Sequence, residues 1–169
     1  MVRDFGTLRN EANIIKYKLA VAELRKSADP LKLAHAVRHL GDAYYYAGEK
    51  TLAERFYVEA LSIYRSHDDR RPLDFANAIR SYAVLKGELG PTDEAKSLWH
   101  EAHDLYLLLQ VPAGVAESAA RLALLAQREN NREQSREWLH EASKAAKVAN
   151  DQETSRFVAE VENLCRLDR

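Results

Sequence analysis

The chain has 169 residues, of which 46% are hydrophobic and 30% charged, a composition that favours one folded domain with a buried core over a disordered chain. Its 25 basic and 26 acidic residues leave a formal net charge of -1, which argues against a general binder of nucleic acid or of anionic membranes. The one cysteine, Cys165, cannot form an intrachain disulfide, and no apolar run approaches the roughly 20 residues of a membrane-spanning helix. We therefore expect a cytoplasmic protein.

The first predicted element is a single helix over residues 8–27. Tyr17 and Ala20 precede Tyr57 and Ala60 by 40 positions, close to the spacing of a repeat that occupies the middle of the chain. Because no partner helix comes before this segment, we interpret it as a terminal cap of the repeats, or equally as the stump of a longer array.

The first full repeat is predicted over residues 30–66 as a pair of helices. The Asp29-Pro30 dipeptide suits the N-cap and the first position of a helix, and Gly48 suits the left-handed residue that ends one. Thr51 and Glu54 have the spacing of a capping box, so they are expected to open the second helix.

Two further repeats are predicted over residues 72–109 and 112–149. The second repeat follows the first at an offset of 42 and the third follows the second at 40, as shown by Ala34, Ala76 and Ala116, by Gly41, Ala83 and Ala123, by Tyr57, Trp99 and Leu139, and by Pro30, Pro72 and Pro112. A Gly90-Pro91 break separates the two helices of the second repeat. Small residues alternate with large ones in this pattern, which is how close helix pairs reach native packing density.

The last predicted element is a helix over residues 152–167. It places Leu164 and Cys165 in the positions that Leu122 and Ala123 hold in the third repeat. This segment is also interpreted as a cap, so the whole chain, residues 1–169, forms one domain.

The repeated residues resemble the tetratricopeptide repeat (TPR) family, whose pattern is an aromatic, Leu-Gly, Tyr, then Ala, an aromatic and Ala. The first repeat matches this pattern at Leu40-Gly41, Tyr44, Ala53, Tyr57 and Ala60. The spacing of about 42 resembles the longer repeat of kinesin light chains. The resemblance covers residues 30 to about 149 and implies an all-α, right-handed superhelical α-solenoid of TPR hairpins with about eight helices.

In TPR-like solenoids the first helices of successive repeats line a concave groove that holds a partner's peptide. The resemblance implies that the groove-facing residues are His35, Arg38, His39, Asp42, Tyr45, Tyr46, Asn77, Arg80, Ser81, Val84, Glu88, Glu117, Arg121, Leu124 and Arg128. Arginine recurs on this face, and its guanidinium can hold a carboxylate bidentately, which favours an acidic peptide or a free C-terminal carboxylate. The alternative is that these arginines pair with Asp42, Glu88 and Glu117 or stay solvated. Tyr46 is expected to reach the groove, or more often to pack on the next repeat's first helix.

Neither a metal site nor a catalytic site is expected. His35 and His39 have a spacing that can hold zinc, with Asp42 as a third ligand, but Arg38 between them disfavours a cation. The sequence has no Gly-rich phosphate loop, nucleophile elbow or Cys-x-x-Cys motif, so no cofactor and no enzyme activity are predicted. His100 and His103 are expected to face the outer surface.

The resemblance therefore implies a non-catalytic scaffold that binds a peptide segment of a protein partner in a concave groove. One alternative is a peptide-responsive sensor domain of a larger signalling protein. Another is a structural module that self-associates into a homo-oligomer. Neither nucleic acid nor a membrane is expected as a partner.

Overall fold

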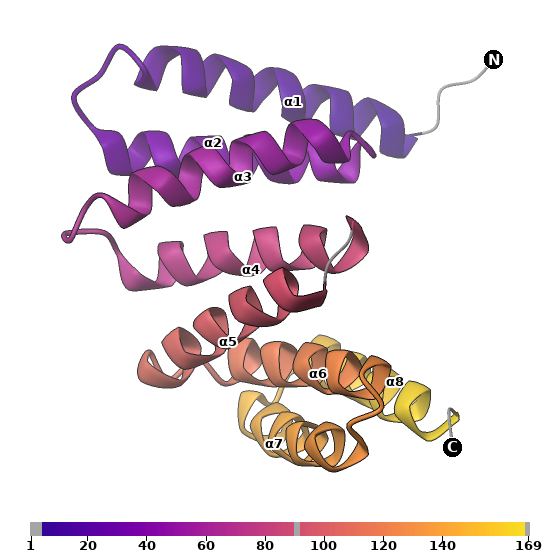
Figure 1. Ribbon diagram of the computed structural model, residues 1–169. Helices are drawn as coiled ribbons and strands as arrows, with labels where there is room; N and C mark the ends of the chain where they lie inside the picture. The colour runs from indigo at the N-terminus through magenta and orange to yellow at the C-terminus, as the bar shows by residue number, and fades with distance from the viewer. Residues whose placement is uncertain (1–4, 90–91, 168–169) are drawn as a thin grey trace. The chain divides into compact units, whose positions relative to one another are not determined.

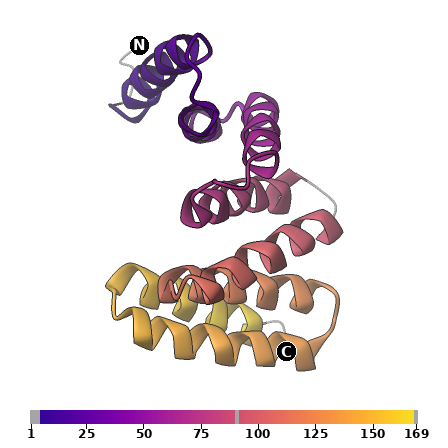
Figure 2. The ribbon, with the colours of Figure 1, turned by 90° about the vertical axis from the view of Figure 1, so that its left-hand side faces the viewer.

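The computed structural model describes residues 5–89 and 92–167, in which every regular element is an α-helix (Figure 1). The helices are α1 (Phe5–Leu24), α2 (Pro30–Tyr46), α3 (Lys50–Arg65), α4 (Pro72–Leu89), α5 (Thr92–Leu108), α6 (Pro112–Arg128), α7 (Arg132–Ala149) and α8 (Gln152–Leu167). The chain divides into two compact units, Met1–Leu89 and Gly90–Arg169. Within each unit successive helices run antiparallel (Figures 1 and 2). In the described residues, no helix is long and apolar enough to cross a membrane.

The three repeated prolines mark the starts of three helices. Pro30, Pro72 and Pro112 are the first residues of α2, α4 and α6. Proline suits this position because its fixed φ is helical and its missing N–H would have no partner in the first turn. Asp29 adds a side-chain cap, since its Oδ1 accepts a hydrogen bond from the backbone N of Lys32 at 3.0 Å.

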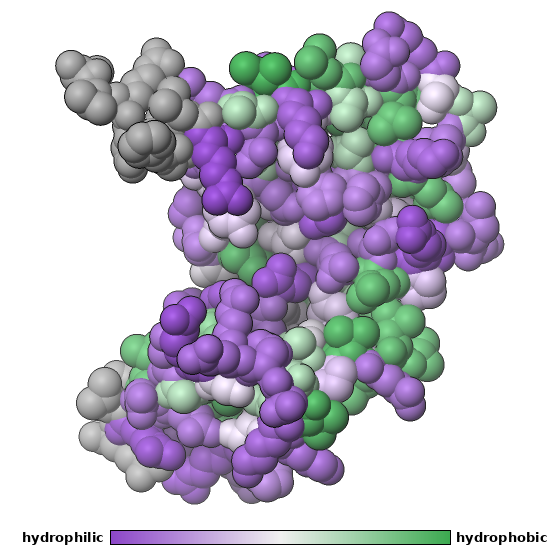
Figure 3. Space-filling model, turned by 180° about the vertical axis from the view of Figure 1, so that it is seen from behind, coloured by the Kyte–Doolittle hydropathy of each residue, from purple (hydrophilic) through white to green (hydrophobic). Residues whose placement is uncertain are grey.

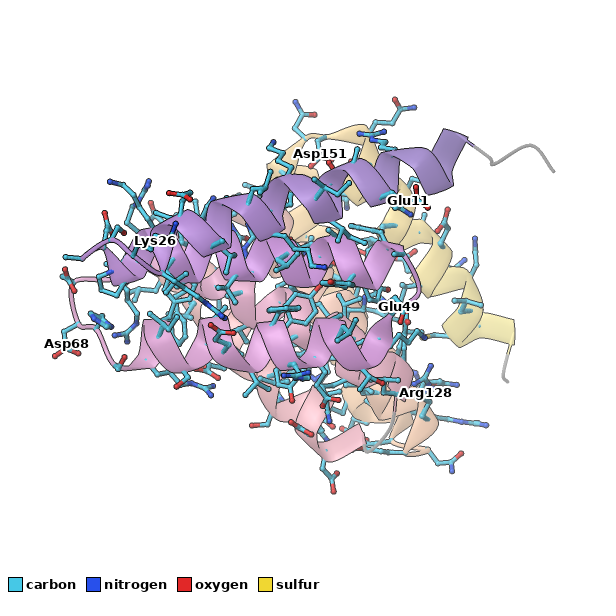
Figure 4. The ribbon with its side chains drawn as sticks, turned by 90° about the horizontal axis from the view of Figure 1, so that it is seen from above. Glu11, Lys26, Glu49, Asp68, Arg128 and Asp151 are labelled. Atoms are coloured by element: carbon cyan, nitrogen blue, oxygen red, sulfur yellow. The ribbon has the colours of Figure 1, made fainter. Side chains whose placement is uncertain are left out.

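The turn between α2 and α3 overturns the predicted capping box. Gly48 has a φ of +82°, and the backbone N of Glu49 bonds back to the carbonyl of Tyr44 at 2.9 Å, so the chain reverses within three residues. Helix α3 consequently starts at Lys50, and the side chain of its N-cap residue, Glu49 (labelled in Figure 4), makes no capping hydrogen bond. Thr51 already lies inside the helix and caps nothing.

Two other predicted boundaries concern the ends of α1 and the break in the second repeat. The helix predicted over residues 8–27 is α1, which begins and ends three residues earlier, because Ser27 bonds back to Leu24 in a turn at 3.1 Å instead of continuing the helix. The predicted break at Gly90-Pro91 lies outside the described residues.

Small residues lie beneath large rings in the core of each unit, as the repeat predicts. In unit 1, Gly41 packs so closely on Tyr57 that an added Cβ would stand 2.7 Å from the ring. Ala53 and Ala60 are fully buried, and Tyr57 is 2% exposed. In unit 2, Trp99 takes the equivalent position and is also 2% exposed. Leu139, which the repeat placed in the same role, is only half-buried.

The cap of α7 gives a first test of how these helices begin. The Oδ1 of Asn131 accepts from the backbone N of Gln134 at 3.2 Å. We expect Asn131→Ala to lower the free energy of unfolding by about 1 kcal/mol, because a helix amide loses its acceptor. Asn131→Ser keeps an acceptor and should stay near the wild type. Urea unfolding followed by tryptophan fluorescence measures both variants, and equal losses would contradict the capping role.

Candidate functional site

A hydrogen-bonded network on α2 forms the centre of the predicted groove face in unit 1. Asp42 accepts a hydrogen bond from Nη1 of Arg38 at 2.8 Å and another from the hydroxyl of Tyr57 at 2.9 Å. Nδ1 of His39 lies 3.4 Å from the same carboxylate. Burial by itself raises the pKa of Asp42, but hydrogen bonds from His39 and Tyr57 and the charge of Arg38 outweigh it and hold that pKa below its usual range. Arg38 therefore pairs with Asp42, which agrees with the alternative prediction that the groove arginines pair with nearby acids.

Beside this network a pocket of about 530 Å³ opens between α1, α2 and the start of α4. We call it the unit 1 pocket. Its lining residues are Tyr17, Ala20, Leu24, Asp29, Leu31, Lys32, His35, Ala36, His39, Tyr64, Arg71 and Asp74. Alanine and leucine side chains contribute its apolar wall. Each cation in it has an acid nearby, with Lys32 2.9 Å from Asp29 and Arg71 3.2 Å from Asp74, so its charge is balanced.

Three aromatic rings form one side of the pocket. The ring of Tyr17 stacks on that of His39, with centroids 5.1 Å apart and planes 10° apart, and His35 meets His39 edge-on at 4.6 Å. Burial, and then the nearby His39 and Arg38, lower the pKa of His35 below its usual value. This shift favours the neutral form of His35, which can both donate and accept a hydrogen bond.

Tyr64 also lines this pocket. Its side chain is 1% exposed, and its hydroxyl has no hydrogen-bond partner in the part of the chain that the structure describes. Burial, and then the charge of Asp74, raises the pKa of Tyr64 to about 12, so the hydroxyl keeps its proton. A buried polar group without a partner is costly.

The C-terminal half of α2 holds the other predicted residues of the first repeat. The hydroxyl of Tyr45 donates to Oε1 of Glu88 on α4 at 2.6 Å. Tyr46, the last residue of α2, is 71% exposed and meets the ring of Tyr45 edge-on. The prediction that Tyr46 packs against a neighbouring first helix is therefore wrong. Helix α2 ends at Tyr46, and the tyrosine ring lies in solvent. Neither tyrosine lines the unit 1 pocket.

The remaining predicted groove residues of unit 1 lie on α4. Ser81 is buried, and its side chain helps to hold the pKa of Asp42 low. Asn77, Arg80 and Val84 are half-buried on the same helix. The structure thus joins Ser81 to the α2 network but does not place these three residues in the lining of the unit 1 pocket.

The predicted residues of the third repeat belong to unit 2. The guanidinium of Arg121 lies over two rings, 4.8 Å from the centroid of Phe157 and 5.9 Å from that of Trp99. Glu117 and Leu124 are half-buried, and Arg128 lies exposed at the C-terminal end of α6 (Figure 4). Arg121 therefore contributes to the packing between α5, α6 and α8.

Two aspects of the site escaped prediction. Tyr17 was interpreted only as a repeat position, and the periodicity gave no sign that Tyr17 and Tyr64 line one pocket. His103, expected on the outer surface, is 4% exposed and lies 3.1 Å from Oε1 of Glu141. The ring of Trp138 on α7 meets His103 edge-on at 5.2 Å and covers it. The residue pattern within one helix cannot predict that a side chain of another helix, here Trp138, buries His103.

Metal binding by the His35, His39 and Asp42 set has no geometric support. Within residues 5–89 and 92–167, no three His, Cys, Asp or Glu side chains are arranged to hold an ion. Nη2 of Arg38 lies 2.7 Å from Nε2 of His39, which puts a positive charge where a cation would have to bind.

The comparisons with known proteins identify the fold of this chain through solved structures. No family model and no curated protein matches this sequence. Among solved structures, BtubC (BKLC) from P. vanneervenii aligns with a TM-score of 0.72 at 20% identity, over 92% of this chain and 65% of BtubC. Aspartyl phosphate phosphatase F from Bacillus subtilis aligns with a TM-score of 0.70 at 15% identity, over 86% of this chain and 40% of the phosphatase.

A third structure aligns over nearly its whole length. The N-terminal domain of stress-induced protein-1 from C. elegans has a TM-score of 0.59 at 19% identity and covers 80% of this chain and 99% of that domain. The chain spans less than two thirds of the length of BtubC and of phosphatase F. These likenesses confirm the predicted all-α, helical-repeat solenoid fold of the TPR type.

Proposed function

We propose that this chain is a non-catalytic, cytoplasmic protein-interaction scaffold and that the unit 1 pocket binds a peptide segment of its partner. The observation that carries the proposal is a pocket that combines an apolar wall with the stacked rings of Tyr17 and His39, and that is also lined by Tyr64, whose buried hydroxyl has no partner among the described residues. Such a pocket suits a peptide side chain with an apolar body and a hydrogen-bonding tip.

The charges of unit 1 bear on the predicted preference for acidic peptides. Arg38 already pairs with Asp42, and the cations that line the pocket are balanced by nearby acids. An acidic ligand would have to compete with these carboxylates. We therefore propose that the pocket selects for shape and hydrogen bonding, with charge as a minor factor.

The test measures the affinity of the chain and its variants for a peptide that is selected from a random library by binding to the whole chain. We expect His35→Ala and Tyr17→Ala to weaken its affinity about tenfold or more, since each removes a wall of the pocket. Tyr46→Ala is the matched control, because this aromatic on the same helix is exposed outside the pocket. A loss on Tyr46→Ala alone would place binding elsewhere and overturn the proposal.

Tyr64→Phe separates binding from folding. Its hydroxyl has no partner in the described protein, so removing it should leave the free energy of unfolding unchanged or slightly higher. Removal should nevertheless weaken the selected peptide's affinity about tenfold if the ligand bonds to this hydroxyl. Isothermal titration calorimetry and urea unfolding measure the two quantities, and unchanged affinity would show that the hydroxyl does not contact the peptide.

A regulatory domain of a larger signalling protein is the second candidate. The observation in its favour is the likeness to 40% of phosphatase F, which is a longer chain. The mass of the protein purified from its natural source tests this candidate. A mass equal to that of the 169-residue chain would remove it.

Self-association is the third candidate, and it rests on exposed apolar residues of α1. Ile15 and Leu19 are 60% and 64% exposed and stand four residues apart, so they share one helix face. The face drawn in Figure 3 shows how exposed hydrophobic residues gather into small groups among hydrophilic ones. Light scattering of the purified chain, with Leu19→Lys as the comparison, decides whether the α1 face pairs two copies.

A further inference from the structure

Unit 2 has an open cleft of about 390 Å³ between α7 and α8, which we call the basic cleft. Arg132 and Arg136 stand one turn apart on α7, Arg166 comes from α8, and Glu162 is the one carboxylate among the described residues that line it. The other lining residues are Gln127, Ser135, Leu139, His140, Ser143 and Cys165. None of these residues belongs to the predicted groove face.

The repeat explains why the cleft exists. Tyr57 in the first repeat and Trp99 in the second are each 2% exposed and fill the space beside the following helix. Leucine takes this position in the third repeat, at Leu139, and is half-buried. The smaller side chain leaves room beside α8, and Ser135 and Cys165, 2% and 8% exposed, lie at the cleft's inner side.

Among the described residues the charges of the cleft are not balanced, in contrast to the unit 1 pocket. The side chains of Arg132 and Arg136 form no hydrogen bond or ion pair with any other described side chain. Arg166 has a single long contact, 3.7 Å to Glu162, and Glu162 also accepts a hydrogen bond from Ser143. Three guanidinium groups therefore face one carboxylate that is already shared. A ligand with carboxylates would complement them, because each guanidinium can hold a carboxylate bidentately.

We propose that the basic cleft binds an acidic peptide segment of a partner protein. Its carboxylates pair with Arg132, Arg136 and Arg166, and an apolar side chain enters beside Leu139. A hydrophobic helix from a second copy fits less well, since it would bury three arginines without partners. This site is independent of the unit 1 pocket, and its proposal does not rest on peptide binding there.

The experiment uses the full chain and a fluorescein-labelled hexapeptide, Glu-Leu-Glu-Glu-Leu-Glu, in fluorescence polarisation at low salt. We expect binding that weakens as salt rises and that falls at least tenfold in Arg132→Ala/Arg136→Ala. Arg156→Ala removes an exposed arginine of α8 that does not line the cleft, and it should stay within about twofold of the wild type. Circular dichroism confirms that each variant is folded.

The remaining arms separate a peptide site from a simple anion site and from self-association. Arg136→Lys keeps the charge but loses the guanidinium fork, so it should bind more weakly than the wild type and more tightly than the double variant. Inorganic phosphate that displaces the peptide at equal concentration would indicate a site for small anions and overturn the proposal. The proposal would also be overturned if the peptide did not bind, or if Arg156→Ala lost as much peptide affinity as the double variant. Peptide binding that disappears as the chain dimerises would overturn it as well.

Discussion

Replacing Gly114 by alanine is expected to lower the free energy of unfolding of unit 2 by about 2 kcal/mol. Gly114 lies on α6 directly against Tyr106 of α5, and an added Cβ would overlap Cγ of the ring. Cγ is the ring atom nearest the backbone, so it cannot swing aside as the far end of a flexible side chain would. Tyr106 is 2% exposed, and neighbouring side chains leave its ring no free space.

The size of this effect comes from two opposing terms. Overpacking a filled core typically costs about 1–3 kcal/mol, and this contact is close enough to place the cost at the upper end. Alanine favours a helix over glycine by about 1 kcal/mol, which offsets part of the loss. The steric term therefore wins. Trp99 and Trp138 are the chain's two tryptophans and both lie in unit 2, so urea unfolding followed by their fluorescence reports this change.

Gly87→Ala is the matched control for Gly114→Ala. Gly87 is also inside a helix, α4, but an added Cβ there would have no atom within 4 Å. Only the propensity term applies, so we expect a gain of about 0.5–1 kcal/mol, read by far-UV circular dichroism. A loss in Gly87→Ala similar to that in Gly114→Ala would mean that glycine matters in these helices for some reason other than ring contact.

The repeat in the sequence predicts contacts that occur inside one helical pair. The alignment of Gly41 with Ala83 and Ala123 identifies where a helix must approach its partner, and the Gly41–Tyr57 contact has this cause. Proline predicts helix starts equally well, because its covalent geometry acts locally. Periodicity and steric limits of this kind depend on spacing along the chain, which the sequence displays directly.

Contacts between helices that the repeat does not relate could not be predicted in this way. The unit 1 pocket joins Tyr17 of α1 to Asp74 of α4, which the sequence separates by 57 positions and assigns to different repeat roles. The cover that Trp138 provides for His103 is of the same kind. The sequence likewise does not show whether an arginine has a charge partner. Of Arg38 and Arg136, which both lie on polar helix faces, only Arg38 has a carboxylate 2.8 Å away.

The second large effect is expected on replacing Asp42 by alanine, which should lower the free energy of unfolding at pH 7 by about 3 kcal/mol. Arg38 and Asp42 are 13% and 21% exposed, so the pair is largely desolvated. Removing the carboxylate leaves the guanidinium without its charge partner and the buried hydroxyl of Tyr57 without its acceptor. Asp42→Asn keeps an acceptor for that hydroxyl and should lose less. Urea unfolding of unit 1, followed by circular dichroism, ranks the two variants.

The same carboxylate predicts a pH dependence with a definite sign. The pKa of Asp42 in the folded protein lies below its ordinary 3.8, so the unfolded chain binds its proton more readily than the folded protein does. The stability from Asp42 is therefore fully present above about pH 4 and is lost as pH falls through 3.8 toward the folded pKa. The difference in unfolding free energy between wild type and Asp42→Asn, measured from pH 7 to pH 3, isolates this carboxylate from the other acids. That difference should shrink as the solution is acidified, and a constant difference would mean that the α2 network depends on shape and not on the charge of Asp42.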